Sequence, residues 1–306
     1  MPAMETEPGT ASPSAIAISW LAASAAYPLT LIGAVFGQGL GALAGGCGWI
    51  GISLPLDRQV WALVNQPVLN FSSLPSAVGY WLGSTLLPLV VATGIIGFLP
   101  RARSFVIELT VVQIAWAMSV IGGAWLPLLD IEDGHVVRFL ALHGRPTALV
   151  WLVPAIAACA ALLPTIRLLE LTRRRRSDAP RSHRLLVVAV HLGTPTAAWV
   201  AVASLVRASF PLRAGVAALV PIAAVLVFAW LRFPRPYVRR LEIPKASEIG
   251  GLAIAALILA SIVYCAGRPL QSGQSAGVLW APAHSFNNIR PWIEAQPTSN
   301  NEAHRP

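Results

Sequence analysis

The sequence predicts an all-α fold, a polytopic bundle of seven or eight transmembrane helices, from three observations. First, 56% of the 306 residues are hydrophobic and only 11% are charged, whereas about a quarter of the residues in a soluble domain are charged. Second, apolar runs of the roughly 20 residues needed to cross a bilayer recur along the chain. Third, the 21 Arg and one Lys gather in short segments between these runs. This composition excludes an ordinary soluble enzyme, a disordered protein and a nucleic-acid binder.

The apolar runs define the expected elements in chain order. An uncharged stretch over residues 11–56 is too long for one span and holds either one kinked span or two. Pro28 is the expected break, because proline lacks a backbone N–H and clashes with the preceding turn. Six further spans are expected at residues 76–99, 104–129, 146–168, 185–206, 209–231 and 247–267. The chain thus divides into a short acidic tail (1–13), a transmembrane helical domain (14–267) and a polar C-terminal tail (268–306).

Arginine sets the expected orientation, because the cytoplasmic loops of membrane proteins are enriched in Lys and Arg. The two most basic segments, 167–184 and 232–246, are separated by two spans and therefore lie on the same side, together with 100–103. This side is expected to be the cytoplasm, which places the C-terminal tail outside it. An odd number of spans puts the N-terminus in the cytoplasm, and an even number puts it outside. The Arg-over-Lys, Ala-rich composition favours a bacterial cytoplasmic (inner) membrane.

Two glycine series predict close packing between helices. Glycines four residues apart lie on one face of a helix, where the missing side chain lets another helix approach. The first series is Gly33, Gly37, Gly41 and Gly45, and the second is Gly79 and Gly83.

A segment with acids and histidines follows the span at 104–129. Asp130, Asp133, His135 and His143 carry carboxylate and imidazole groups, and both groups bind zinc. The same segment also fits a solvated turn, because Asp-Gly is typical of turns. No other cofactor is indicated, and the three cysteines show neither metal-binding nor disulfide spacing.

Two ionisable residues fall inside expected spans. Glu108 lies about one turn from the cytoplasmic end of its span, and His191 about two turns from the same end. Such groups cost a few kcal/mol in a bilayer unless they are paired or hydrated. A Glu108–His191 pair would be a candidate proton relay. The alternative is that Glu108 reaches the interface or meets Arg103, while His191 is neutral and packs between helices.

Three colinear segments resemble motifs of the site-2-protease-like intramembrane zinc metalloproteases. Residues 27–46 (YPLTLIGAVFGQGLGALAGG) resemble the zinc helix of that family, in which HExGH precedes a helix of small residues. Residues 79–83 (GYWLG) are similar to a glycine-rich segment of the family's middle span. Pro127 and Asp133-Gly134-His135 resemble the family's Pro-x-x-x-Asp-Gly motif, whose Asp is the third zinc ligand, although two more residues separate Pro and Asp here.

The residues that would perform this family's chemistry are missing. Phe36, Gly37 and Leu40 stand where His, Glu and His are expected, and only Gly39 matches. The two histidines would hold zinc and the glutamate would activate water, so the resemblance implies a degenerate relative without the protease site. The acidic segment is also similar to the first half of the CDP-alcohol phosphotransferase motif. Residues 139–160 contain none of the aspartates of the second half, which argues against that enzyme class.

These observations favour a multi-pass membrane protein that is not an enzyme. Its expected partners are the lipid bilayer and other membrane proteins, which it would bind or scaffold through its glycine-faced helices. One alternative is a metal-dependent, intramembrane-protease-like hydrolase that uses Asp130, Asp133, His135 and His143. Another is a proton-coupled transporter that uses Glu108 and His191.

Overall fold

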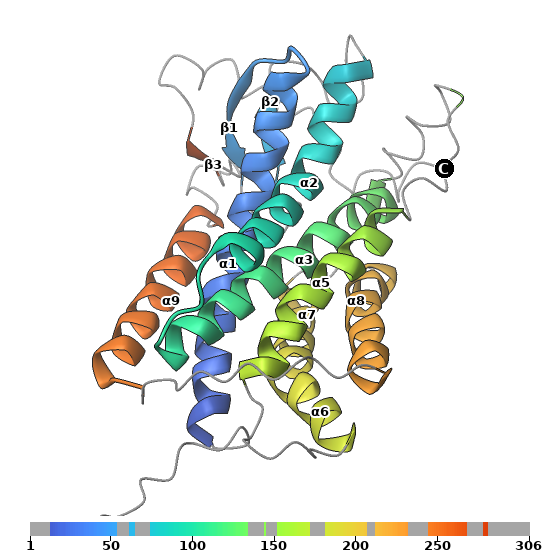
Figure 1. Cartoon of the computed structure of the whole chain (residues 1–306). Helices are drawn as coiled ribbons and strands as arrows, with labels where there is room; N and C mark the ends of the chain where they lie inside the picture. Colours follow the sequence, from blue (N-terminus) through green and yellow to red (C-terminus); the bar gives the residue numbers. More distant parts are fainter. Residues whose placement is uncertain are drawn as a thin grey trace, which may run out of the picture.

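The chain forms a helical bundle with a small sheet at one end (Figure 1). The computed structural model describes residues 13–53, 61–64, 74–133, 144, 152–171, 181–206, 212–231, 244–267 and 278–280. Its helices are α1 (Pro13–Ala44), α2 (Leu74–Phe98), α3 (Phe105–Asp133), α5 (Leu152–Leu171), α6 (Arg181–Val188), the π-helix η2 (Ala189–Gly193), α7 (Thr194–Val206), α8 (Leu212–Leu231) and α9 (Ala246–Gly267). The helical architecture predicted from the sequence is confirmed.

The helices suit a lipid environment. In the described part of the chain, five are long and apolar enough to cross a membrane: Pro13–Ala44, Ala77–Phe98, Phe105–Gly123, Leu152–Leu171 and Ser182–Val202. Shorter apolar helices cover Pro221–Trp230 and Ala246–Ile262. Large apolar side chains lie on the outside, such as Val90 and Phe98, whereas Gln113 is 0% exposed. Apolar outer surfaces, with the buried polar side chains kept inside the bundle, are what the hydrocarbon of a bilayer requires, so the chain is a membrane protein.

Helix α1 crosses the bundle without a break. Pro28 lies inside it, so the helix is not broken there, and of the two alternatives for this stretch the single span is the one that forms. The missing N–H is tolerated because α1 packs against α2, α3 and α9, and neighbouring helices commonly support prolines within spans. Only one helix therefore occupies the long uncharged stretch at the start of the chain.

A glycine turn ends α1. Gly46 has φ of +90°, a left-handed conformation that favours glycine. Its N–H donates to the carbonyl of Leu43 at 3.0 Å, and the N–H of Cys47 donates to the carbonyl of Ala42 at 2.9 Å. This hydrogen-bond pattern is the Schellman motif. The motif ends α1, and the chain continues as a strand, so the uncharged stretch does not form a second span.

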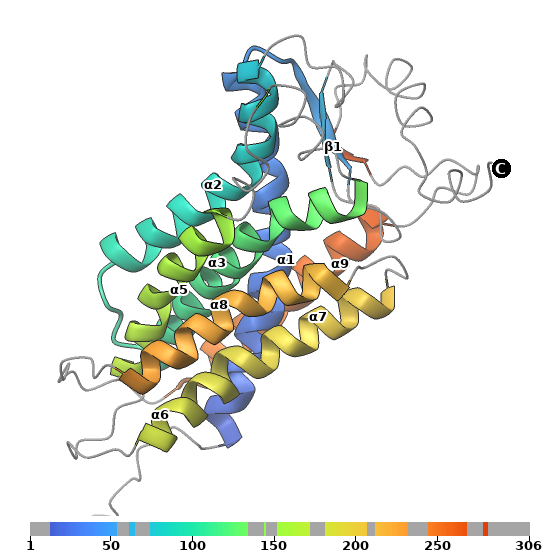
Figure 2. The same ribbon diagram turned by 90° about the vertical axis from the view of Figure 1, so that its right-hand side faces the viewer.

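The strand that follows belongs to a three-stranded antiparallel sheet, which hydropathy did not indicate. Its strands are β1 (Trp49–Ser53), β2 (Trp61–Val64) and β3 (Val278–Trp280), in the order β2-β1-β3. Ala62 of β2 is fixed to the bundle, because its N–H donates to Gln38 Oε1 at 2.8 Å and its carbonyl accepts from Tyr80 Oη at 3.0 Å. A segment of the C-terminal tail thus returns to the end of the bundle where α1 stops (Figures 1 and 2).

Helix α3 is the central helix and contacts α1, α2, α5 and α8. It extends to Asp133, beyond the span expected at 104–129, so Asp130 and Asp133 stand on the last turns of a helix. The helix continues past the apolar run because no Gly or Pro interrupts residues 128–133. The side chains of these two aspartates, together with His135 and His143, lie outside the described residues.

Candidate functional site

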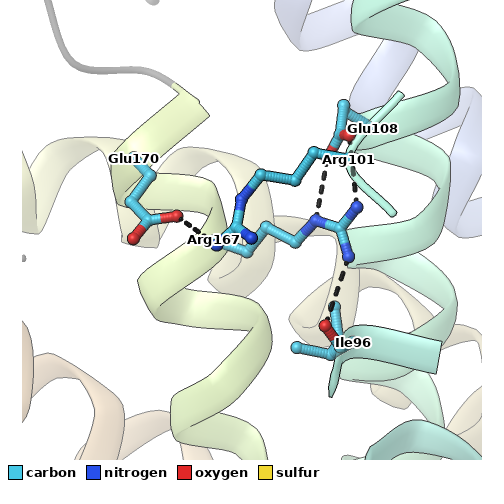
Figure 3. A network of polar contacts seen from close by, with 5 residues as sticks. All are labelled: Ile96, Arg101, Glu108, Arg167 and Glu170. Atoms are coloured by element: carbon cyan, nitrogen blue, oxygen red, sulfur yellow. Dashed lines mark hydrogen bonds and ion pairs between the residues drawn. The ribbon is translucent and has the colours of Figure 1, made fainter. Parts of the chain in front are cut away.

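A buried ion pair joins α3 to α5 (Figure 3). Both oxygens of the Glu108 carboxylate accept hydrogen bonds from Arg167, from Nε at 2.8 Å and from Nη2 at 3.1 Å. The two side chains are each 4% exposed. Nη1 of the same guanidinium donates to the carbonyl of Ile96 at 3.4 Å, which belongs to the last turn of α2 and has no helical partner. One arginine therefore neutralises a carboxylate and caps a helix end at the same time.

This arrangement corrects two predictions. The Glu108–His191 pair is not formed, because Arg167 takes both carboxylate oxygens. Arg167 also belongs to α5, which continues to Leu171, and it is buried rather than part of a cytoplasmic basic loop. A guanidinium can donate to both oxygens of a carboxylate at once, which an imidazole cannot do, so Arg167 is the better partner for Glu108 than His191.

Further polar contacts surround the pair at this end of the bundle. Arg101 Nη2 lies 2.8 Å from Glu170 Oε2, in a more exposed ion pair (Figure 3). Ser104 Oγ donates to Glu248 Oε2 at 2.9 Å and accepts the N–H of Ile107 at 3.5 Å, as an N-cap residue of α3 does. Glu248 also accepts the N–H of Lys245 at 3.3 Å, which caps the start of α9. These contacts tie the starts of α3 and α9 to each other and the end of α5 to the turn after α2.

A second polar group lies deeper in the bundle, between α1, α3 and the helix that contains η2. We call it the polar seam, and it consists of Ser19, Tyr27, Gln113, Trp116, His191 and Thr196. Gln113 Nε2 donates to the carbonyl of His191 at 2.6 Å and to Ser19 Oγ at 2.6 Å, and Ser19 Oγ donates to the same carbonyl at 3.1 Å. His191 is 1% exposed. The α3 residue that hydrogen-bonds to His191 is thus Gln113, through the backbone carbonyl of His191, and not Glu108.

The other half of the polar seam centres on Thr196. Its hydroxyl accepts the indole N–H of Trp116 at 2.9 Å, lies 2.5 Å from the hydroxyl of Tyr27, and donates to the carbonyl of Leu192 at 2.7 Å. The Tyr27 ring stacks on Trp199 with centroids 5.1 Å apart. Buried Tyr and Trp rings pack against their neighbours while their O–H or N–H group makes a hydrogen bond. The polar seam therefore joins three helices through buried hydrogen bonds.

Four of the six candidate glycines bring α1 and α2 together. A Cβ on Gly37 would overlap the carbonyl of Gly83, and a Cβ on Gly41 would overlap the carbonyl of Gly79. Likewise, a Cβ on Gly83 would overlap the carbonyl of Gly37, and a Cβ on Gly79 would overlap the carbonyl of Gly41. A Cβ on Gly33 would meet no atom within 4 Å, while Gly45 belongs to the turn after α1. At these four glycines the helix face is therefore occupied by a contact within the chain, whereas the face at Gly33 stays open.

The positions that match zinc ligands in the resembling family face a different environment. Phe36 is 41% exposed and Leu40 is 47% exposed, whereas Gly37 packs against α2. The ring of Trp49 lies edge-on to Phe36 with centroids 5.3 Å apart and covers Gly39, where a Cβ would overlap the indole. This face of α1 is apolar and partly exposed, and Trp49 covers it at Gly39. Within the described ranges no group of three metal-binding side chains is found.

The comparisons with known proteins identify no relative: no family model, no curated protein and no solved structure matches the chain. The interpretation of the sites therefore depends on their geometry.

Proposed function

We propose that the chain is a non-catalytic, multi-pass protein of the bacterial cytoplasmic membrane that binds other membrane-spanning proteins. The observation that carries this proposal is the apolar character of the α1 face around Phe36 and Leu40, the positions of the family's two histidines, with Trp49 packed on it. Apolar side chains there bind no metal and activate no water. Glu108 supports it too, because a carboxylate held on both oxygens by Arg167 is poorly placed to act as a base.

The proposed topology has seven spans. The passages are α1, α2, α3, α5, the continuous helix α6–η2–α7, α8 and α9. Helices α5 and α8 end, and α6 and α9 begin, at the end opposite to the sheet (Figure 1). The sequence between these helix ends, 172–180 and 232–243, is arginine-rich, so the positive-inside rule puts that end in the cytoplasm. The N-terminus is then cytoplasmic, and the C-terminal tail is extracytoplasmic.

Helix α9 is the proposed binding surface, in place of the glycine faces of α1 and α2. It packs mainly against α1, through residues that include Leu252 and Ala256. Its outer side exposes Ile254, Leu257 and other large aliphatic side chains. A Cβ on Gly251 would meet no atom within 4 Å. Bulky side chains beside an unfilled glycine suit the close approach of a transmembrane helix from another protein.

Photo-crosslinking in native membranes tests this proposal. A photoreactive residue in place of Leu257 on α9 is expected to form a crosslinked band with one discrete protein, because a bound helix would cover this position. Val90, an equally apolar and exposed residue of α2, is the matched control and is expected to react with lipid only. Introducing Gly251→Ile is expected to abolish the band from Leu257. Absence of a band, or equal bands from Leu257 and Val90, would contradict the proposal.

A proton-coupled transporter is the second candidate, and the polar seam favours it. Transporters commonly build their sites from interrupted helices near the middle of the bilayer. Here η2, which contains the ionisable His191, interrupts a span. Gln113 Oε1 is a buried acceptor without a hydrogen-bond partner among the described residues. Proton flux into proteoliposomes that depends on His191 would favour this candidate over the first.

A further inference from the structure

The span that contains the π-helix has an irregular hydrogen-bond pattern where α6 gives way to α7. Thr194 N–H donates to the carbonyl of Ala189, five residues back, which is the π-helical pattern. The carbonyl of Val190 accepts the hydroxyl of Thr194 at 2.7 Å, and that of Leu192 accepts the hydroxyl of Thr196 at 2.7 Å. Only the carbonyl of His191 depends on other helices, because its donors are Ser19 and Gln113.

Pro195 explains this dependence. In a regular α-helix the carbonyl of His191 would accept the N–H of residue 195, but proline has no N–H. Gly193 lies two residues earlier and weakens the helix further, since glycine has a high conformational freedom. Threonine hydroxyls that bond to carbonyls one turn back also bend helices. The local sequence therefore disfavours a straight helix between α6 and α7.

The two halves of this span are held differently. Helix α6 packs against α8 and α5, whereas α7 contacts α1 and otherwise mainly its own η2 segment in the described part of the chain. On α7, Thr194, Ala197 and Val202 are exposed. A helix with few packing partners opens locally at a low free energy. The hydrogen bonds of the polar seam therefore position α7 together with the packing of Trp199 and Val200.

We infer that η2 is a hinge that lets α7 move relative to α6, and that Ser19 and Gln113 latch this hinge by binding the carbonyl of His191. Thr196, bound by Tyr27 and Trp116, latches the first turn of α7. The latch joins α7 to both α1 and α3. The hinge is a conformational device of the bundle, and it does not depend on the partner-binding role proposed above.

Hydrogen–deuterium exchange of the full-length protein in lipid nanodiscs tests this inference. Gln113→Leu keeps the volume of the side chain but removes both donors, and it is expected to speed exchange at residues 189–206 about tenfold relative to α6. Ser119→Ala is the matched control: it lies on the same helix, is equally buried, and loses only a bond to its own helix, at Ala115. It is expected to leave the exchange of residues 189–206 unchanged.

A second variant acts in the opposite direction. Pro195→Ala supplies the missing N–H to the carbonyl of His191, so it is expected to slow exchange at residues 189–206 by several-fold. The inference is overturned if Gln113→Leu exchanges like Ser119→Ala at these residues, or if it speeds exchange equally in all spans. It is also overturned if Pro195→Ala leaves the exchange of α7 unchanged.

Discussion

At the scale of single residues, the buried charges of this protein serve structure. Glu108 and Arg167 lie on different helices, and neither could remain charged alone in a nearly water-free interior at acceptable cost. Arg167 also satisfies the carbonyl of Ile96, so its loss would leave two groups without partners. Removing one member of the pair is therefore costly, whereas replacing both members by apolar residues is not.

Removing one member of the pair is expected to destabilise the bundle. Arg167→Met leaves a buried carboxylate unpaired, and the free energy of unfolding is expected to fall by about 3–5 kcal/mol. Adding Glu108→Leu to the same protein removes that carboxylate and is expected to recover most of the loss. Arg101→Met, at the more exposed pair with Glu170, is the control and should cost less than about 1 kcal/mol. Steric-trapping measurements in detergent check these values, and additive losses in the double variant would contradict them.

The sequence could locate these residues but not their partners. Glu108 and His191 stood out because ionisable groups are rare in spans. Arg167 did not, because an arginine one turn inside a helix end looks the same in sequence as an arginine in a loop. Gln113, Ser19 and Thr196 gave no signal of their own, since neutral polar residues are common in spans. Pro195 was the available clue, because it predicts an unpaired carbonyl at His191.

At the scale of elements, α1 and α2 pack at the distance that glycine allows. The carbonyls of Gly79 and Gly83 occupy the space where side chains on Gly41 and Gly37 would lie. Without a hydrophobic driving force between helices in lipid, such close van der Waals packing supplies much of the association energy. The sheet adds to this contact, because Ala62 is bonded to Gln38 of α1 and to Tyr80 of α2.

Alanine substitutions in the two glycine environments are expected to have opposite signs. Gly41→Ala places a methyl group against the carbonyl of Gly79, so the helices must separate, at a cost of about 1–3 kcal/mol. Gly33→Ala meets open space and is expected to stabilise the protein by up to about 1 kcal/mol, because alanine is the better helix former. Thermal unfolding in detergent measures both. Destabilisation of the same size in both variants would show that the close contact is not what matters.

The spans could be predicted from hydropathy, whereas the strands and the uninterrupted helix around Pro28 could not. The spans expected at 76–99 and 247–267 agree closely with α2 and α9, because a long apolar run has one stable form in lipid. The helix is not broken at Pro28, since packing by neighbouring helices outweighs the loss of one N–H. The sheet escaped notice because its strands are short and one of them, β3, lies over 200 residues after the others.

At the scale of the whole molecule, the polar contacts divide the bundle into two ends. The sheet and the glycine contact gather at the end where α1 stops and α2 begins. The ion pairs and the N-terminal caps of α3 and α9 gather at the other end, where α2 and α5 stop. The polar seam lies between them. Among the described residues, the printed ion pairs therefore lie at the end where α5 stops and α9 begins.

This asymmetry leads to a prediction about both chain ends. Because β3 pairs with β1, residues 278–280 lie on the side of the sheet, away from the arginine-rich side. If the latter is cytoplasmic, alkaline phosphatase fused after residue 306 is expected to be active and a green fluorescent protein at the same place dark. The same reporters fused before Met1 are expected to give the opposite result, because the seven proposed passages would put the two ends on opposite sides. A fluorescent C-terminal fusion would overturn the orientation, and two ends that behave alike would overturn the odd number of spans.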